Sequence, residues 1–469
     1  MELGWGLSKL LVLPLYLTWI LAIILTLAYR IEIGIFLVIP FIPHQNVLHY
    51  IHSLPLGKEL NDLLLVAVII KWVINKRKAN ESVFIKTPLN IPLVVLMLWT
   101  YIGVWWGTIY FGDPLPLTLK DFRFAYWIFL MRIPLMYFII VNNIKNPDHK
   151  KLIIFLIIMA ILLLDRNFYN IAMYKDLSYY DDNQKVGGMA ALGGNELSVF
   201  FAMYTIVLVA LLSYARNFWL KCLLFIPIGA SYYCTAFLFS RSGYLASVVG
   251  LIAVGFLKNK NILIALVVVG LFWQVLLPNA VKQRIEMTKT EDGLDETSLQ
   301  RFAMWEIGQE IIFSSPILGA GIQAAQALDI TPEGFKGRVW HSFHNGYVQQ
   351  AVETGFIGLG IYLWIFSLMI LIGWRLYRAG IDDWLQQGLG LGLIACVLAC
   401  LAGNIAGGYW NYFSVVGYMY VIAGLVMQSL IDIEQEKDVS LSVQDNINET
   451  NIKKNSTAFR SIQTEQSVQ

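Results

Sequence analysis

Charged residues are scarce in this chain. Only 14% of its 469 residues are Asp, Glu, Lys or Arg, whereas 57% are hydrophobic. Soluble globular domains carry about 25% charged residues, so the composition excludes an ordinary soluble domain. The formal net charge is only +2, which gives no electrostatic reason to expect nucleic acid as a partner. Repeated apolar runs of about 20 residues instead predict many membrane-spanning helices, and hence membrane lipids as partners.

Cysteine is also rare. The four cysteines, Cys222, Cys234, Cys396 and Cys400, all lie in or beside apolar runs. A disulfide framework is therefore not expected. Cys396 and Cys400 share one helix face, but two thiols without His or carboxylate partners make a poor metal site. We predict no metal site and no cofactor.

Thirteen apolar segments predict an all-α fold, a polytopic membrane helix bundle occupying residues 1–432. No small-residue cleavage site follows the first segment, so we expect a retained helix rather than a signal peptide. The second is interrupted by Pro40, Pro43, His44 and Gln45, and is either a full span or a re-entrant piece. We therefore expect 12 or 13 transmembrane helices. The segments are 10–28, 33–51, 60–75, 88–111, 122–141, 150–165, 190–213, 219–238, 243–257, 262–278, 345–373, 386–406 and 411–432.

Short basic loops predict the orientation, because Lys and Arg favour the cytoplasmic side. These loops are 76–78, 145–151, 216–221, 258–260 and 375–378. Their alternation with the spans places 166–189 and 279–344 on the outer side. The polar residues 433–469, rich in Asn, Gln, Ser and Glu, predict a disordered cytoplasmic tail.

Two spans rich in aromatic residues, 88–111 and 122–141, have two interpretations. Trp and Tyr favour the headgroup level and would form an interfacial belt. Alternatively, they would line a wall for a lipid or sugar ligand. Gly388, Gly390 and Gly392 predict close helix packing.

The outer loop 279–344 is too long for a plain connector. Residues 297–300 resemble a capping box that opens a helix, and Phe302, Trp305 and Ile312 would give that helix an apolar stripe. Pro316 and the glycines after it would end the helix. A polar stretch, 329–338, then leads to the sequence His-Ser-Phe-His-Asn at 341–345. We predict a partly helical loop that packs on the bundle or lies at the interface.

Three residues in and near this loop suggest chemistry. Arg241 lies between two apolar segments, where a charge either faces a cavity or snorkels to the interface. Arg301 is either a solvated helix charge or a partner of Arg241. Two converging arginines would suit phosphate, because the guanidinium fork matches its oxygens. A neutral His344 beside them would be a candidate general base whose pKa the cations lower. No Asp-rich motif accompanies them, so arginine rather than a divalent ion would hold the phosphate.

The chain resembles the O-antigen ligase and O-antigen polymerase superfamily of bacterial polytopic glycosyltransferases. Three patches between about 240 and 360 carry the resemblance, in the order that the family has them. The first is Ser-Arg-Ser-Gly at 240–243. The second runs from 295 to 301 and on to Ser-Pro-Ile-Leu-Gly-Ala-Gly at 315–321. The third is His344-Asn345, nine residues, then Gly355 and Gly358. A weaker match is Gly-Asn-Glu at 194–196.

The resemblance implies a glycan donor on undecaprenyl diphosphate, bound at the outer face of the bacterial inner (plasma) membrane. The glycan passes to an acceptor hydroxyl, without metal and with inversion. Arg241 and Arg301 would hold the diphosphate, His344 would activate the acceptor, and Asn345 would orient His344 or the sugar. His341 is either a second base or a polar loop residue. The predicted substrate-binding residues are Ser240, Ser242, Trp305, His341 and Asn345.

Three classes of function compete: a lipid-linked glycan transferase, a transporter and a structural scaffold. Within the first class we favour a ligase-like enzyme, since the spacing from His344 to Gly358 fits it. A polymerase or a protein O-oligosaccharyltransferase shares the motif and differs in its acceptor, which is a glycolipid, a glycan or a protein. A small-anion transporter should show paired half-helices or an inverted repeat, and we find no convincing one. A structural scaffold would not require two arginines and a histidine together.

Overall fold

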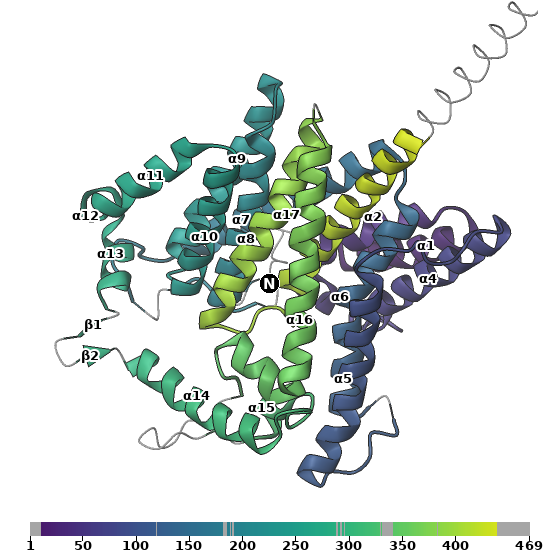
Figure 1. The fold of residues 1–469 in the computed structure, drawn as a ribbon, viewed down its shortest axis with the longest axis horizontal. Helices are drawn as coiled ribbons and strands as arrows, with labels where there is room; N and C mark the ends of the chain where they lie inside the picture. The colour runs from purple at the N-terminus through teal and green to yellow at the C-terminus, as the bar shows by residue number, and fades with distance from the viewer. Residues whose placement is uncertain are drawn as a thin grey trace, which may run out of the picture.

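The computed structural model describes residues 11–438, except for 119, 182–184, 188, 190–191, 288, 291–292, 295, 329, 331–340 and 382. Figure 1 shows that helices dominate this part of the chain, beside one small antiparallel pair of strands, β1 (Lys289–Thr290) and β2 (Gly293–Leu294). Among the described helices, eight are long and apolar enough to cross a membrane, or up to nine if a bent pair is one span. The predicted all-α polytopic bundle is confirmed.

Every predicted apolar segment falls on a helix of the structure. The longer helices are α4 (Leu60–Lys78), α5 (Asn90–Phe111), α6 (Phe122–Asn143), α7 (Pro147–Ala172), α8 (Gly194–Leu212), α9 (Phe218–Phe237), α14 (Glu296–Ser314), α16 (Gly346–Ala379), α17 (Trp384–Gly403) and the helix Phe413–Asp438. The shorter ones are α1 (Val12–Ala28), α2 (Ile31–Phe41), α3 (Gln45–Leu48), η2 (His49–Ile51), α10 (Arg241–Leu257), α11 (Lys260–Leu271), α12 (Trp273–Leu276), α13 (Asn279–Glu286), α15 (Ala324–Ala327) and η4 (Asn404–Ala406).

The predicted 12 or 13 spans exceed the eight or nine that pass on length and composition in the described residues. The difference has a physical reason. α1, α10 and α11 are each shorter than 18 residues, while α4 carries charged residues in both its first and last turns. The doubtful segment 33–51 is bent by 107° between α2 and α3. The buried His44 lies at this bend, with its Nε2 3.0 Å from the carbonyl oxygen of Ala160.

The glycines of α17 let it approach two neighbouring helices at once. Gly388 and Gly392 face α8, and Gly390 faces α16. A Cβ atom on Gly390 would lie 2.6 Å from the backbone nitrogen of Tyr377, which is closer than packed atoms allow. The predicted close helix packing is confirmed.

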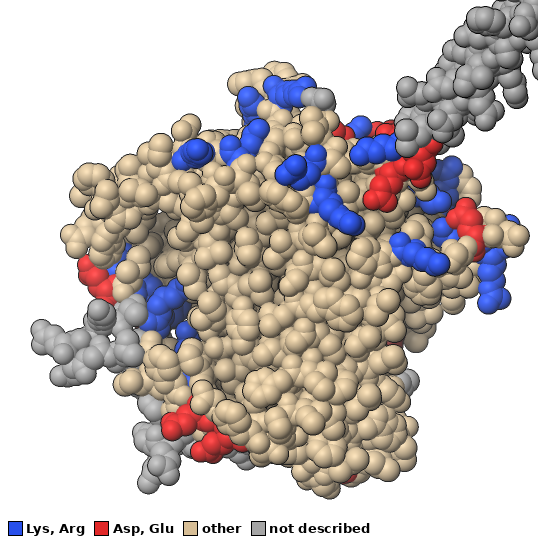
Figure 2. Space-filling view, viewed as in Figure 1, with Lys and Arg blue, Asp and Glu red and all other residues tan. Residues whose placement is uncertain are grey.

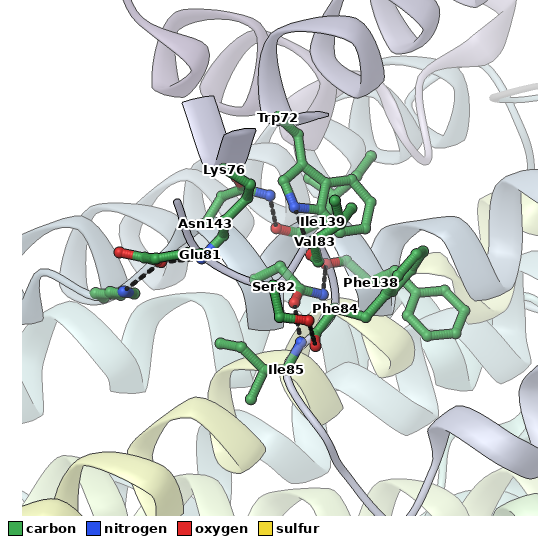
Figure 3. A network of polar contacts seen from close by, with 12 residues as sticks. Trp72, Lys76, Glu81, Ser82, Val83, Phe84, Ile85, Phe138, Ile139 and Asn143 are labelled. Carbon is green, nitrogen blue, oxygen red and sulfur yellow. Dashed lines mark hydrogen bonds and ion pairs between the residues drawn. The ribbon is translucent and has the colours of Figure 1, made fainter. Parts of the chain in front are cut away.

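The connection between α4 and α5 is folded tightly against the bundle (Figure 3). The Trp72 indole donates to the carbonyl oxygen of Val83 over 3.0 Å, and the Lys76 ammonium donates to Glu81 over 2.7 Å. The Phe84 ring packs edge-on between the rings of Trp72 and Phe138. This basic loop is therefore fixed to both α4 and α6.

Basic side chains gather at the end of the molecule where α16 finishes, whereas α14 and α15 lie at the opposite end (Figures 1 and 2). The helix Phe413–Asp438 continues past residue 432, the predicted end of the membrane domain. The first six residues of the predicted tail are thus helical, and 439–469 lie outside the described residues.

A break inside α16 receives the turn that follows α14. Gly355 adopts φ 69° and ψ −178°, a conformation essentially restricted to glycine. The freed backbone N–H of Phe356 donates to the carbonyl oxygen of Pro316 over 2.8 Å. A Cβ atom on Gly355 would overlap the carbonyl group of Ile317. The turn 315–321 is thereby seated in the kink of α16.

Two tryptophans of α5 hold this junction from the other side. The Trp99 indole donates to the carbonyl oxygen of Thr354 over 2.9 Å, and the Trp106 indole donates to that of Gly319 over 2.7 Å. These two side chains therefore hold the backbone of the junction through hydrogen bonds. The interfacial belt and the ligand wall both stay predictions for the aromatic residues of the two spans 88–111 and 122–141.

Replacing Gly355 with Ala is expected to destabilise the protein, because the backbone conformation alone costs about 1–3 kcal/mol for a residue with a side chain and the methyl group overlaps Ile317. The matched control is Gly360→Ala in the same helix, where an added Cβ atom meets nothing within 4 Å. Thermal unfolding of both purified variants in detergent tests this. A Gly355→Ala melting temperature equal to that of Gly360→Ala would contradict the role of the kink.

Candidate active site

One face of α14 carries the residues that assemble the site. The helix begins at Glu296, which confirms the predicted helix in the outer loop. Ser298, Arg301 and Trp305 follow at spacings of three and four residues and therefore point to the same side. The Trp305 indole donates to the carbonyl oxygen of Phe343 over 2.8 Å. Trp305, predicted to contact substrate, thus holds the segment that carries His344.

Arg241 is the first residue of α10, and it reaches across to α14. Its Nη1 lies 3.4 Å from the Oγ of Ser298, to which it donates. Arg301 lies one helical turn further along α14. The structure therefore brings together the first two patches that the sequence singled out.

His344 is held in an unusual backbone conformation just before α16. Its φ is +48°, in the left-handed region that non-glycine residues rarely adopt. Its backbone N–H donates to the Oγ of Ser342 over 3.2 Å. The next residue, Asn345, caps α16, because its Oδ1 accepts from the backbone N–H groups of Tyr347 (2.9 Å) and Val348 (3.2 Å). Asn345 thus has a structural role, and its contact with substrate stays a prediction.

Electrostatics tie His344 to Arg301. Burial, and secondly the positive charge of Arg301, lower the pKa of His344 from 6.5 to about 4. The imidazole is consequently neutral near pH 7, the state that a general base requires. The positive charge of Arg301 thus acts on the pKa of His344 in the direction that the sequence predicted.

Ser240 and Ser242, which the sequence predicted to bind substrate, are both buried in the structure. Their hydroxyl oxygens are 2.9 Å apart. The Ser242 Oγ is 2.8 Å from the hydroxyl oxygen of Tyr409. Burial raises the pKa of Tyr409, and the hydrogen bond from Ser242 opposes that rise. The two serines therefore hold Tyr409, and this geometry does not favour their predicted contact with substrate.

Tyr409 itself connects further parts of the chain to the site. Glu196, in the first turn of α8, adds to the rise in the pKa of Tyr409, while the positive charge of Arg301 opposes it. The weak sequence match at 194–196 thus lies near the other patches. Sequence analysis did not identify Tyr409, because no local pattern reveals a hydroxyl buried against a distant helix.

A third arginine lies near Arg241. Arg284 of α13 is buried, and its Nε donates over 3.1 Å to the carbonyl oxygen of Phe239, two residues before Arg241. Its guanidinium also packs over the ring of Tyr180, at 4.9 Å. Figure 2 shows basic side chains gathered on this side of the molecule, between α13 and α14. Sequence analysis missed Arg284, although its spacing from Ala280 places it on the buried face of α13.

A cavity of about 440 Å³ borders the beginning of the segment 341–345. His341, which is exposed, and Ser342 line it, together with side chains from the N-terminal half such as Lys58 and Arg132. Arg132 forms an ion pair of 2.6 Å with Asp62 of α4. The lining residues do not include His344. The sequence offered no motif in the N-terminal half, so the contribution of α4 and α6 to this cavity was not predicted.

Within the described residues, no group of three or more His, Cys, Asp or Glu side chains is placed to hold a metal ion. Cys396 and Cys400 are buried free thiols in α17.

Comparison with known proteins agrees with this geometry. No curated protein matches the chain. Residues 228–363 match the family model described as O-antigen ligase. That match contains Arg241, Arg301, His344 and the kink at Gly355, and it supports a membrane glycosyltransferase of the O-antigen ligase or polymerase type. The matched segment, residues 228–363 of this multi-pass membrane protein, is thus similar to the O-antigen ligase family and supports the resemblance to the ligase and polymerase superfamily.

Proposed function

We propose that the protein is an O-antigen ligase-like glycosyltransferase that moves a glycan from undecaprenyl diphosphate to an acceptor hydroxyl. The observation that carries the proposal is the position of Arg301, which acts electrostatically on a neutral His344 while its helix contacts Arg241. Guanidinium groups suit a diphosphate, and a neutral imidazole suits a hydroxyl proton. A polymerase or a protein O-oligosaccharyltransferase would use the same groups on a different acceptor.

The site is proposed to face the outer side of the bacterial inner membrane. Basic side chains gather at the opposite end of the molecule (Figure 2), and Lys and Arg favour the cytoplasmic side. The C-terminal helix ends near that basic end (Figure 1), which supports a cytoplasmic C-terminus.

The proposed reaction is a single displacement without metal. His344 accepts the proton of the acceptor hydroxyl, whose oxygen forms a bond to the anomeric carbon. The bond from that carbon to the diphosphate oxygen breaks, and its electron pair remains on the diphosphate. Arg241 and Arg301 stabilise the negative charge on this leaving group. Attack opposite the leaving group inverts the anomeric carbon.

Replacing His344 with Gln is expected to reduce glycan transfer about 10²–10⁴-fold, the usual contribution of a general base. The control is Glu310→Gln, an exposed change on α14 that leaves the base in place. Surface glycan in cells, normalised to protein abundance, measures the effect. Normal glycan from a normally abundant His344→Gln protein would remove His344 as the base.

Replacing Arg241 or Arg301 with Gln is expected to raise the KM for the lipid diphosphate donor about 10–100-fold, because a hydrogen bond to a charged group contributes about 1.5–3 kcal/mol. Lysine at either position should restore part of this loss, since it keeps the charge but not the fork. Arg375→Gln, an exposed change in the last turns of α16, is the control. A donor KM unchanged in both site variants would exclude diphosphate binding by these arginines.

The titration of His344 offers a test that does not require activity. A pKa of about 4 means that the ring is neutral above that pH and becomes protonated only as the pH falls through it. Arg301→Gln should raise this pKa, but not to 6.5, because burial is the larger cause. Ring-labelled histidine NMR, with His344→Gln for assignment, measures both values. A wild-type His344 that titrates near 6.5 would contradict the proposed environment.

A further inference from the structure

We propose that the cavity beside His341 binds an uncharged, hydroxyl-rich sugar ring of the acceptor glycan, and that Glu353 accepts a hydrogen bond from one of its hydroxyl groups. The inference rests on the proposed function, since it assigns acceptor and donor to opposite sides of the segment 341–345. The cavity volume of about 440 Å³ falls within the range of small-molecule sites, roughly 300–1,000 Å³.

Glu353 is a buried carboxyl group that lines the cavity with one oxygen unsatisfied. It is only 1% exposed, and its Oε1 accepts from the Gln349 amide over 3.3 Å. Its Oε2 has no hydrogen-bond partner among the described residues. Leaving such an acceptor buried and unpaired is costly, and a ligand hydroxyl in the cavity would remove that cost. A ligand carboxylate placed against Glu353 would meet a like charge, so the inference for this contact is limited to a neutral hydroxyl group of an uncharged ring.

Two further residues of the lining have buried polar atoms without partners. Both the Oδ1 and the Nδ2 of Asn61 lack a hydrogen bond within the described part of the chain, as does the Nε of Arg132. The Nη2 of Arg132 donates to Asp62 over 2.8 Å. The cavity therefore presents donors and acceptors together. Sugar hydroxyl groups both donate and accept, and they match such a mixed set.

Aromatic rings complete the lining. Tyr126 and Phe129 of α6 and Tyr412 border the same cavity. A sugar ring has apolar C–H faces between its hydroxyl groups, and aromatic side chains offer rigid apolar surface for them. Lys58 would attract an inorganic anion as well, but these rings would add nothing to its binding, so the aromatic part of the lining favours a sugar over a free phosphate.

A chain of hydrogen bonds links Glu353 to the backbone of His344. The His344 N–H donates to the Ser342 Oγ over 3.2 Å, and the Ser342 Oγ donates to the Gln349 Oε1 over 3.2 Å. The Gln349 Nε2 then donates to Glu353. A sugar held by Glu353 thus lies against the segment that carries the proposed base, where an acceptor hydroxyl is required.

The test uses the full chain in lipid nanodiscs with a thiol reporter in the cavity. Gln326, an exposed residue of the lining, is replaced by Cys in a Cys222→Ser background, because the other described cysteines are buried. The rate at which N-ethylmaleimide alkylates the reporter is measured at increasing concentrations of maltopentaose or chitopentaose. At least one of these should slow alkylation, and inorganic pyrophosphate should not.

Glu353→Gln keeps the shape of the side chain and replaces the unsatisfied acceptor, and Asn61→Leu removes the second polar group. With either substitution, the oligosaccharide concentration needed to protect the reporter should rise about tenfold. This is the change expected for the loss of a hydrogen bond to a buried polar or charged group. Glu310→Gln, an exposed change on α14, should leave protection unchanged, and so should Arg301→Gln.

The acceptor assignment is overturned if neither oligosaccharide protects the wild-type reporter. It is equally overturned if protection survives in both Glu353→Gln and Asn61→Leu. Neither result depends on transfer. Failure of the proposed function would instead appear as normal transfer by His344→Gln, so the two failures are distinguishable.

Discussion

The backbone break at Gly355 is the constraint on which the site depends. A continuous α16 would use its own N–H and carbonyl groups, and it could not bind the turn 315–321. At the kink, the N–H of Phe356 binds Pro316 and the carbonyl oxygen of Val352 accepts from the Ala320 N–H over 2.6 Å. These bonds fix the end of α14 beside the beginning of α16. A helix that is anchored in this way can hold its charged face against the segment 341–345, whose own backbone is strained.

Helical periodicity then distributes the contacts of α14. Ser298 meets α10 through Arg241, Arg301 acts on His344, and Trp305 binds the carbonyl oxygen of Phe343. These three side chains share one face of α14 and act on three different parts of the site. A shift of any of them by one position in the sequence would turn it away from its partner. On the far side of α16, the indole groups of α5 hold the same junction. The proposed catalytic groups are consequently positioned by packing and by hydrogen bonds.

The sequence predicted what depends on local pattern. Apolar runs located the long apolar helices, a capping box located α14, and the spacing around Arg241, Arg301 and His344 identified groups that the fold brings together. Asn345 was interpreted through its resemblance to a family, although an Asn before a helix is itself a capping signal that explains its contacts. Tyr409, Arg284 and Glu353 were not found, because their importance arises from burial against distant elements. The ion pair between Asp62 and Arg132 likewise joins two helices whose sequences show no motif.

Electrostatics distinguish the two arginines near His344 from the cavity beside His341. Arg241 and Arg301 lie on α10 and α14, whereas the cavity toward α4 and α6 presents a buried carboxyl group, amides and aromatic rings beside Lys58 and the paired Arg132. An anionic leaving group is stabilised by the two arginines, whereas next to Glu353 it would meet a like charge. A neutral sugar gains most in the cavity, where hydrogen-bonding groups lack partners. A displacement reaction needs its leaving group and its attacking group on opposite faces of the reacting carbon. The asymmetry of charge therefore supplies a physical reason why donor and acceptor would approach His344 from different directions.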